Sequence, residues 1–256
     1  MARYKLILAY DGAAFAGSQR QASTLSKAGA RKAVRTVQGE LEKALRGLGW
    51  SGRSVLLAGR TDTGVHAVGQ VAALDMEWAH ENVALREALN ARLPFELAVR
   101  DVEIVNSDFH PRFDAASRHY RYSLFCEEVR NPLREKTAWR VWPIIDGNLL
   151  GEIAGVFIGK KDFSAFGSAP GKNMNTVRTV MQSGWKKIED IWNYDVTADA
   201  FLYRMVRRLV AVQVAVAQGR CSVGSVVKAL EKPQLKSGLP AGLAPAHGLE
   251  LIEVGY

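Results

Sequence analysis

Residues 177–199 read VRTVMQSGWKKIEDIWNYDVTAD, and this stretch predicts two strands joined by a tight turn. The strands are expected at residues 177–187 and 192–199, with the turn at residues 188–191. Strands joined this closely pair antiparallel. Elsewhere strands and helices mix without a regular βαβ alternation, so we expect an α+β fold with a largely antiparallel sheet.

The same periodicity places the other elements and divides the chain into two halves. Further strands are expected at residues 3–10, 54–58, 68–75, 98–105, 117–126 and 249–254. Helices are expected at residues 37–48, capped by Thr36, and at residues 82–92, 149–158, 201–218 and 222–231. The boundary is expected near residues 106–112, which gives an N-terminal half of residues 1–106 and a C-terminal half of residues 107–256.

Charge is concentrated at the start of the chain. The 256 residues carry a formal net charge of +8, and residues 1–60, with 11 basic and 3 acidic side chains, account for all of it. Between Gly12 and Gly39 there is no carboxylate, whereas the basic residues there are Arg20, Lys27, Arg31, Lys32 and Arg35. Such a block is either a solvated loop or an arm that binds the phosphates of a nucleic acid.

The composition indicates a folded protein of the cytosol. Apolar residues make up 48% of the chain, yet no run approaches the roughly 18 residues of a membrane span. The apolar run between Lys5 and Asp11 is shorter than the apolar region of a signal peptide, about 7–15 residues. Cys126 and Cys221 are far apart and have no CxxC partner, so we expect reduced thiols and no metal or other cofactor.

The densest polar segment is GRTDTGVHA at residues 59–67, directly after an apolar strand. One interpretation is a turn in which Asp62 accepts backbone N–H groups. The other is a catalytic carboxylate that a nearby cation keeps ionised. His66 stands alone, without a Ser-His-Asp spacing, and is expected to be structural.

Two further segments combine aromatic and basic residues. Residues 109–114 read FHPRFD and residues 117–122 read SRHYRY. On a strand, Arg118, Tyr120 and Tyr122 share one face. That face suits stacking on an unpaired base and contact with phosphates, although a core strand with solvated edges fits the pattern equally well.

The third segment is FLYRMVRRLV at residues 201–210, expected at the start of a long apolar helix. Arg204 and Arg208 would then lie one turn apart, with Arg207 at the margin of the apolar face. A guanidinium at such a margin either pairs with an acid or a phosphate, or extends to water.

Taken in chain order, the motifs resemble the tRNA pseudouridine synthase A family. They are YDG at residues 10–12, FAG at 15–17, TVQGELE at 36–42, GRTDTGVHA at 59–67, NARLP at 90–94, FHPRF at 109–113, YRY at 120–122, DFSAF at 162–166, FLYRMVRRLV at 201–210 and APAHGL at 244–249. The resemblance implies two similar halves whose antiparallel sheets join into one extended sheet, with helices packed on it and a catalytic cleft between the halves. It also implies a homodimer that isomerises uridine to pseudouridine at positions 38–40 of the tRNA anticodon stem-loop, without a cofactor.

The resemblance assigns roles to individual residues. Asp62 would be the catalytic aspartate, Tyr120 would stack on the target uracil and is a candidate for moving the C5 proton, and Arg207 would pair with Asp62. Arg60 would hold the flipped-out nucleotide, and Arg20, Arg204 and Arg208 would contact the tRNA.

The chain departs from the family pattern at three places. Ser18 stands where the family has tryptophan, residues 22–35 are longer than expected, and Ala211 replaces a glycine. A non-catalytic RNA-binding module of the same fold is the alternative interpretation. A glycosidic-bond hydrolase generally needs two carboxylates, and no second one stands out near Asp62.

Overall fold

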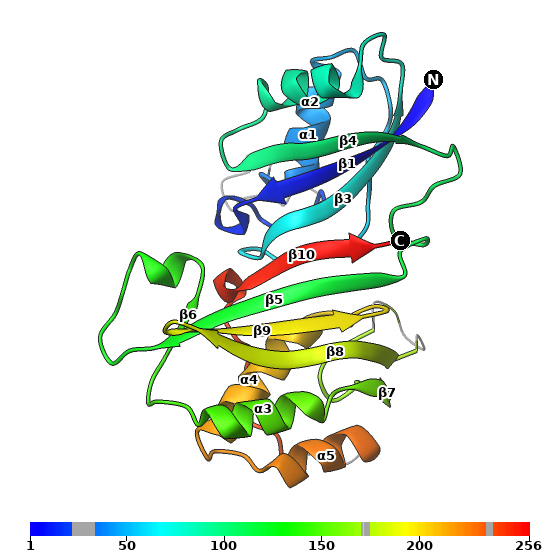
Figure 1. Cartoon of the computed structure of the whole chain (residues 1–256). Helices are drawn as coiled ribbons and strands as arrows, with labels where there is room; N and C mark the ends of the chain where they lie inside the picture. Colours follow the sequence, from blue (N-terminus) through cyan, green and yellow to red (C-terminus); the bar gives the residue numbers. More distant parts are fainter. Residues whose placement is uncertain (22–33, 170, 172–174, 234–237) are drawn as a thin grey trace, which may run out of the picture. The chain divides into compact units, whose positions relative to one another are not determined.

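The chain forms two compact units. A computed structural model describes residues 1–21, 34–169, 171, 175–233 and 238–256. Unit 1 consists of residues 1–116 with residues 251–254 and 256, and unit 2 consists of residues 117–250 and 255. Figure 1 shows helices and antiparallel strands in both units, which confirms the α+β class expected from the sequence.

Unit 1 is built on antiparallel strands. Strand β1 (Ala2–Tyr10) lies between β4 (Leu97–Val105) and β3 (His66–Met76) and pairs with both. The short strand β2 (Leu56–Leu57) pairs with β3. The described helices of this unit are α1 (Val37–Arg46), α2 (Asn82–Asn90) and the 3-10 turn η1 (Gly12–Ala14).

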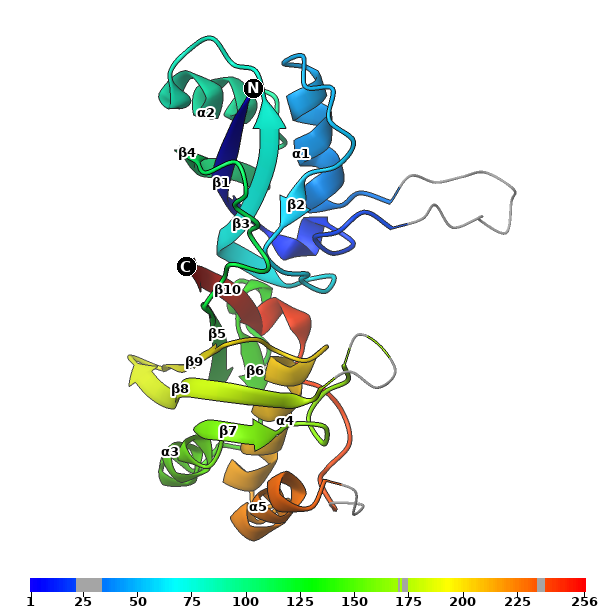
Figure 2. The same ribbon diagram turned by 90° about the vertical axis from the view of Figure 1, so that its right-hand side faces the viewer.

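The core of unit 1 follows from alternation along β1 and a helical stripe on α1. The Thr36 hydroxyl accepts the Gly39 N–H at 3.2 Å and so begins α1, as expected. Figures 1 and 2 show α1 beside β1 and β3. The apolar residues buried on the two elements are Tyr4, Leu6, Leu8 and Tyr10 of β1 and Val37, Leu41, Ala44 and Leu45 of α1.

Unit 2 contains four antiparallel strands in sequence across the ten-stranded sheet of the chain. Its strand order is β5 (Ser117–Cys126), β9 (Ile191–Ala198), β8 (Val177–Ile188) and β7 (Gly159–Asp162). The hairpin expected at residues 177–199 is confirmed as β8 and β9, and its turn contains Glu189 with a φ of 55°. Strand β6 (Trp139–Val141) pairs with β5 in the parallel direction.

The helices of unit 2 supply about half of its buried apolar residues. They are α3 (Gly147–Gly155), α4 (Met205–Ala217), α5 (Val223–Glu231) and the 3-10 turns η2 (Arg134–Lys136) and η3 (Ala246–Gly248). Ten of the thirteen residues of α4 are buried, because the helix lies beside the sheet and packs against α3 (Figure 2). The last strand, β10 (Leu249–Gly255), places residues 251–254 in unit 1 and the rest in unit 2.

The three largest differences from the sequence-based expectation concern α4, β6 and β7. The helix expected from residue 201 begins only at Met205, since Arg204 has a left-handed φ of 62° and the backbone of Tyr203 is bonded to that of Ser168. Strands β6 and β7 were not expected at all. Both are short, and the GKKD sequence of β7 has no apolar alternation.

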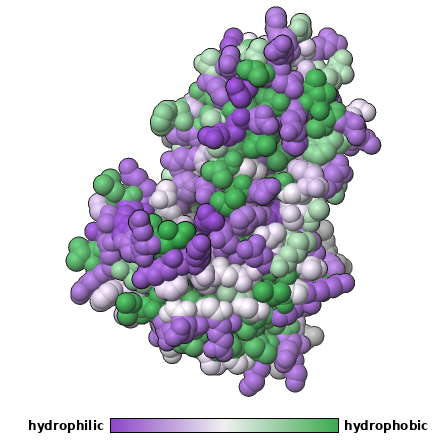
Figure 3. Space-filling model, in the orientation of Figure 1, coloured by the Kyte–Doolittle hydropathy of each residue, from purple (hydrophilic) through white to green (hydrophobic). Residues whose placement is uncertain are grey.

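Several large apolar side chains are exposed, and they are distributed over different elements. Phe95, Phe113 and Leu133 are at least three-quarters exposed, and they lie far apart in the sequence. Figure 3 shows hydrophobic residues interspersed with hydrophilic ones on the face it draws. Scattered apolar residues of this kind are ordinary for a protein surface. In the described part of the chain, no helix is both long and apolar enough to span a membrane.

Candidate active site

The loop at residues 59–67 presents Asp62 on a folded-back backbone just before β3. Asp62 is half-buried, and its carbonyl accepts the Val65 N–H at 3.1 Å. Gly64 adopts a φ of 83°, a left-handed conformation that a side chain would strain. The loop therefore turns sharply after the aspartate, which leaves the carboxylate on a short and well-defined segment.

The end of β1 holds the start of this loop. The Tyr10 hydroxyl lies 2.9 Å from Thr61 Oγ1, and both residues are at most 8% exposed. Gln70 of β3 donates to the Gly59 carbonyl at 3.1 Å and to the Tyr10 hydroxyl at 3.4 Å. Burial raises the pKa of Tyr10, so the phenol stays protonated and its hydroxyl can still donate a hydrogen bond.

The turn after β1 holds the other end of the loop. Gly64 donates its N–H to the Gly12 carbonyl at 3.1 Å, and Gly12 donates its own N–H to His66 Nδ1 at 3.2 Å. A Cβ on Gly12 would stand 2.0 Å from the Val65 carbonyl oxygen, so the backbones touch. His66 also lies 3.2 Å from Asp11, and its contacts are those of a residue that fastens the loop.

Tyr120 lies on β5 in unit 2. Its backbone pairs with Val196 of β9, and its ring is half-buried. The ring meets that of Phe201 edge to face, with 5.2 Å between the centroids. An edge-to-face neighbour favours one orientation of a ring.

Arg207 is held by the segment that precedes β10. Its Nε donates to the Ala244 carbonyl at 2.8 Å, and Ala244 donates its N–H to the Arg207 carbonyl at 3.1 Å. Next to this contact, the Tyr122 hydroxyl donates to the Pro245 carbonyl at 2.9 Å. Burial raises the pKa of Tyr122 well above its usual value, and the charge of Arg207 opposes that shift.

The remaining arginines expected at the site have different environments. Arg60 and Arg204 are exposed, and the Arg204 guanidinium lies 4.7 Å from the centroid of the Tyr203 ring. Arg208 donates to the carbonyls of Pro240 and Gly242, and burial lowers its pKa. Arg204 precedes α4, so it does not share a helical face with Arg208 as expected.

The expected site residues fall into two groups. Arg20, Arg60 and Asp62 belong to unit 1. Tyr120, Arg204, Arg207 and Arg208 belong to unit 2. The pairing of Asp62 with Arg207 stays a prediction. Residues 22–33, which form most of the expected basic arm, lie outside the described residues.

Two supports of the site were missed in the sequence. Gln70 is a buried glutamine inside an otherwise apolar strand, and this polar interruption was an available signal. The carbonyls of Ala244 and Pro245 act through the backbone, so no side-chain pattern reveals them.

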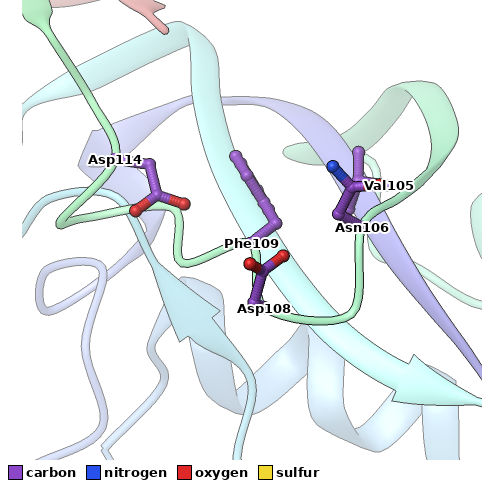
Figure 4. A pocket seen from close by; sticks show the side chains of 5 residues that line it. All are labelled: Val105, Asn106, Asp108, Phe109 and Asp114. Atoms are coloured by element: carbon purple, nitrogen blue, oxygen red, sulfur yellow. The ribbon is translucent and has the colours of Figure 1, made fainter.

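A separate pocket of about 580 Å³ lies after β4 and contains none of the expected site residues. It is lined by Val105, Asn106, Asp108, Phe109 and Asp114, and Figure 4 shows the two carboxylates beside Phe109. Carboxylates repel phosphates, so this pocket does not suit an RNA backbone. Among the described residues, no group of three or more His, Cys, Asp or Glu side chains is arranged to hold a metal ion.

Comparison with known proteins supplies the family. A family model described as tRNA pseudouridine synthase matches residues 7–114 and 153–256, which include Asp62 and Arg207. A tRNA pseudouridine synthase A of Geobacter sp. (strain M21) is 36% identical over 258 residues, covering 100% of this chain and 99% of that protein. The one of Methylacidiphilum infernorum (isolate V4) is 39% identical over 254 residues, covering 99% of this chain and 95% of that protein.

Among solved structures, a Cbf5-Nop10-Gar1 complex contains a similar chain, with a TM-score of 0.37 and 13% identity. That match covers 98% of this chain and 49% of the other, and it is too distant to bear on function. The family model and the end-to-end relatives are decisive on their own. With Asp62 on its anchored loop and both halves matched, this chain belongs to the tRNA pseudouridine synthase family of isomerases.

Proposed function

We propose that this chain isomerises uridine to pseudouridine at positions 38–40 of the tRNA anticodon stem-loop, with Asp62 as the nucleophile. The observation that carries the proposal is the anchored loop that holds Asp62. Its side chain is half-buried on a loop whose two ends are bonded to Tyr10 and Gly12. A carboxylate held this way can approach a flipped-out nucleotide in one orientation.

The reaction needs no reagent beyond the protein and the RNA. Asp62 attacks either C6 of the uracil or C1′ of the ribose, and the N1–C1′ bond breaks. The base then turns, C5 bonds to C1′, and the Asp62 adduct is released. The proton on C5 leaves and N1 gains a proton, so the mass of the RNA does not change.

The other site residues have roles that match their environments. Tyr120, oriented by Phe201, stacks on the target uracil and is the candidate for moving the C5 proton. Arg207 pairs with Asp62 and keeps the carboxylate ionised. Arg60, exposed two residues before Asp62, contacts the flipped-out nucleotide.

The tRNA backbone is held by basic side chains. Arg204 is exposed beside Tyr203 and suits a phosphate contact. Arg20 and Arg208 are assigned the same role, although each also has a protein partner. If the basic residues 20–35 grip phosphates, binding weakens steeply with salt, and a variant with Lys27, Arg31 and Lys32 neutralised has a shallower slope.

We also infer that the enzyme works as a homodimer in the cytosol. Light scattering of the purified protein is expected to give twice the 28.1 kDa of one chain. A single-chain mass at micromolar concentration contradicts the dimer but leaves the isomerase proposal intact.

The decisive experiment uses unmodified tRNA transcripts labelled with tritium at C5 of uracil. Wild type is expected to release tritium, and a carbodiimide stop assay is expected to map the product to the anticodon stem-loop. Asp62→Asn is expected to release none. Asp108→Asn is the matched control, because Asp108 is an exposed carboxylate in the separate pocket and its loss leaves release unchanged.

Each other outcome rejects a part of the proposal. Tight tRNA binding without tritium release from several tRNAs identifies a non-catalytic RNA-binding module. Free uracil and an abasic site identify a hydrolase. Full activity of Asp62→Asn removes the nucleophile assignment.

A further inference from the structure

Ser18 is a buried serine whose side chain reaches the residue before Asp62. It is 0% exposed, and its hydroxyl accepts the Thr61 N–H at 2.9 Å. Ser18 also donates its own N–H to the Thr61 carbonyl at 3.1 Å. Both backbone polar groups of Thr61 are therefore bonded to this one residue.

We propose that Ser18 is a positioning residue for Asp62, a role that rests on the nucleophile assignment under the proposed function. The Thr61 hydroxyl is already bonded to Tyr10 and its two backbone groups to Ser18. Because three groups of Thr61 are hydrogen-bonded, the backbone that leads into Asp62 has little freedom to move. The direction of the carboxylate then depends on the Ser18 hydroxyl.

Close backbone packing supports this role. Gly17 adopts a φ of 92°, and a Cβ there would lie 3.0 Å from the Thr61 carbonyl oxygen and 3.8 Å from the Asp62 carbonyl carbon. The segment before α1 and the loop that carries Asp62 thus run in direct contact. A small displacement of one segment is passed directly to the other.

The segment that carries Ser18 is itself anchored to α1. Gln38 donates its N–H to the Ser18 carbonyl at 2.9 Å, and its side-chain oxygen accepts the Arg20 N–H at 2.8 Å. The Arg20 guanidinium lies 3.0 Å from Glu42, which is fully buried. A continuous set of hydrogen bonds therefore runs from the core of α1 through Ser18 to the loop of Asp62.

The consequence for catalysis is one of geometry and not of charge. A displacement of the reacting group by about 1 Å can cost on the order of 10²-fold in rate, while the tRNA contacts stay in place. Loss of the Ser18 hydroxyl is therefore expected to lower kcat by about 10-fold to 100-fold and to leave KM for tRNA within about two-fold.

The test compares Ser18→Ala with Ser183→Ala in the tritium-release assay. Ser183 is the matched control, because it is also a buried serine whose hydroxyl is hydrogen-bonded to the backbone, at the Ala154 carbonyl, but it belongs to unit 2, whereas Asp62 belongs to unit 1. A role in stability alone predicts similar losses in both variants. The positioning role predicts a fall in kcat only for Ser18→Ala. Exchange of the Thr61 amide, followed by NMR, is expected to speed up in Ser18→Ala and not in Ser183→Ala.

Ser18→Cys covers the case in which the alanine variant does not fold, since it keeps the size and offers a weaker acceptor. Its kcat is expected to fall between those of wild type and Ser18→Ala, or below wild type if the latter is unfolded. A kcat within two-fold of wild type in either folded variant of Ser18 overturns the proposal, as does an equal fall in Ser183→Ala. An inactive wild type instead rejects the proposed function itself, so the two failures are distinct.

Discussion

Replacing Glu42 by alanine tests whether the hydrogen-bond network that runs from α1 through Ser18 to the loop of Asp62 stabilises the fold at its buried end. Glu42 is 0% exposed on α1, and its Oε1 accepts hydrogen bonds from Gln38 Nε2 at 3.0 Å, Ser54 Oγ at 3.2 Å and the Val55 N–H at 3.1 Å. In the alanine variant the Val55 N–H stays buried and loses this acceptor. A buried donor without a partner costs about 1–3 kcal/mol.

The other carboxylate oxygen of Glu42 faces two arginines. Oε2 lies 3.0 Å from Arg20 and 3.6 Å from Arg46, and both arginine side chains are about half exposed. Because they can return to water, most of the loss comes from the groups that stay buried. Together with the space left by the side chain, the expected loss of unfolding free energy is about 4 kcal/mol.

Urea unfolding at neutral pH measures this loss. The matched control is Glu40→Ala on the same helix, where the carboxylate lies 3.5 Å from the half-exposed Arg35, and its expected change is within about 0.5 kcal/mol. Glu42→Gln keeps one acceptor oxygen and is expected to lose roughly half as much as the alanine variant. A loss below about 1 kcal/mol in Glu42→Ala would refute the reasoning, because the buried donors would then be satisfied without the carboxylate.

Three further predictions concern the site and its supports. Arg207→Lys keeps the charge but removes the Nε donor and the planar fork, so kcat for tritium release is expected to fall by about 10²-fold with tRNA binding retained; wild-type kcat would contradict the role. Gly12→Ala places a Cβ 2.0 Å from the Val65 carbonyl and is expected to lose about 2–3 kcal/mol in urea unfolding, whereas Gly59→Ala, with nothing within 4 Å, is the control; equal effects would count against the close contact. Burial raises the pKa of Tyr194 from 10.0 to about 12, so the unfolded chain loses this proton first. The contribution of Tyr194 to the free energy of unfolding is therefore fully present below pH 10, and it is lost as the pH rises toward 12, by up to roughly 1.4 kcal/mol per pH unit. Tyr194→Phe is expected to flatten this decline, and an identical slope in the variant would exclude this tyrosine as the cause.

Elements with a strong local pattern were predicted well from the sequence. Strand β5 has the predicted bounds, and the β8–β9 hairpin differs from expectation by about one residue at its ends. The start of α1 was predicted because Thr36 caps a helix through a contact only three residues away. Such features depend on neighbours in the chain, which a single sequence displays.

Features that depend on distant partners were not predicted. Strand β7 reads GKKD, and its strand conformation comes from pairing with β8. The late start of α4 follows from the bond between Tyr203 and Ser168, 35 positions earlier in the chain. Neither partner leaves a mark in the local pattern of hydrophobic residues.

The same division holds for the candidate site. From the sequence alone, Asp62, Tyr120 and Arg207 are predicted as site residues, because their types and order form recognisable motifs. Only the tertiary structure assigned the positioning contacts, in which the hydroxyl of Ser18 and the carbonyl of Ala244 act. A serine hydroxyl and a backbone carbonyl are common to every protein, and their function is decided by the partner that the fold brings within 3 Å.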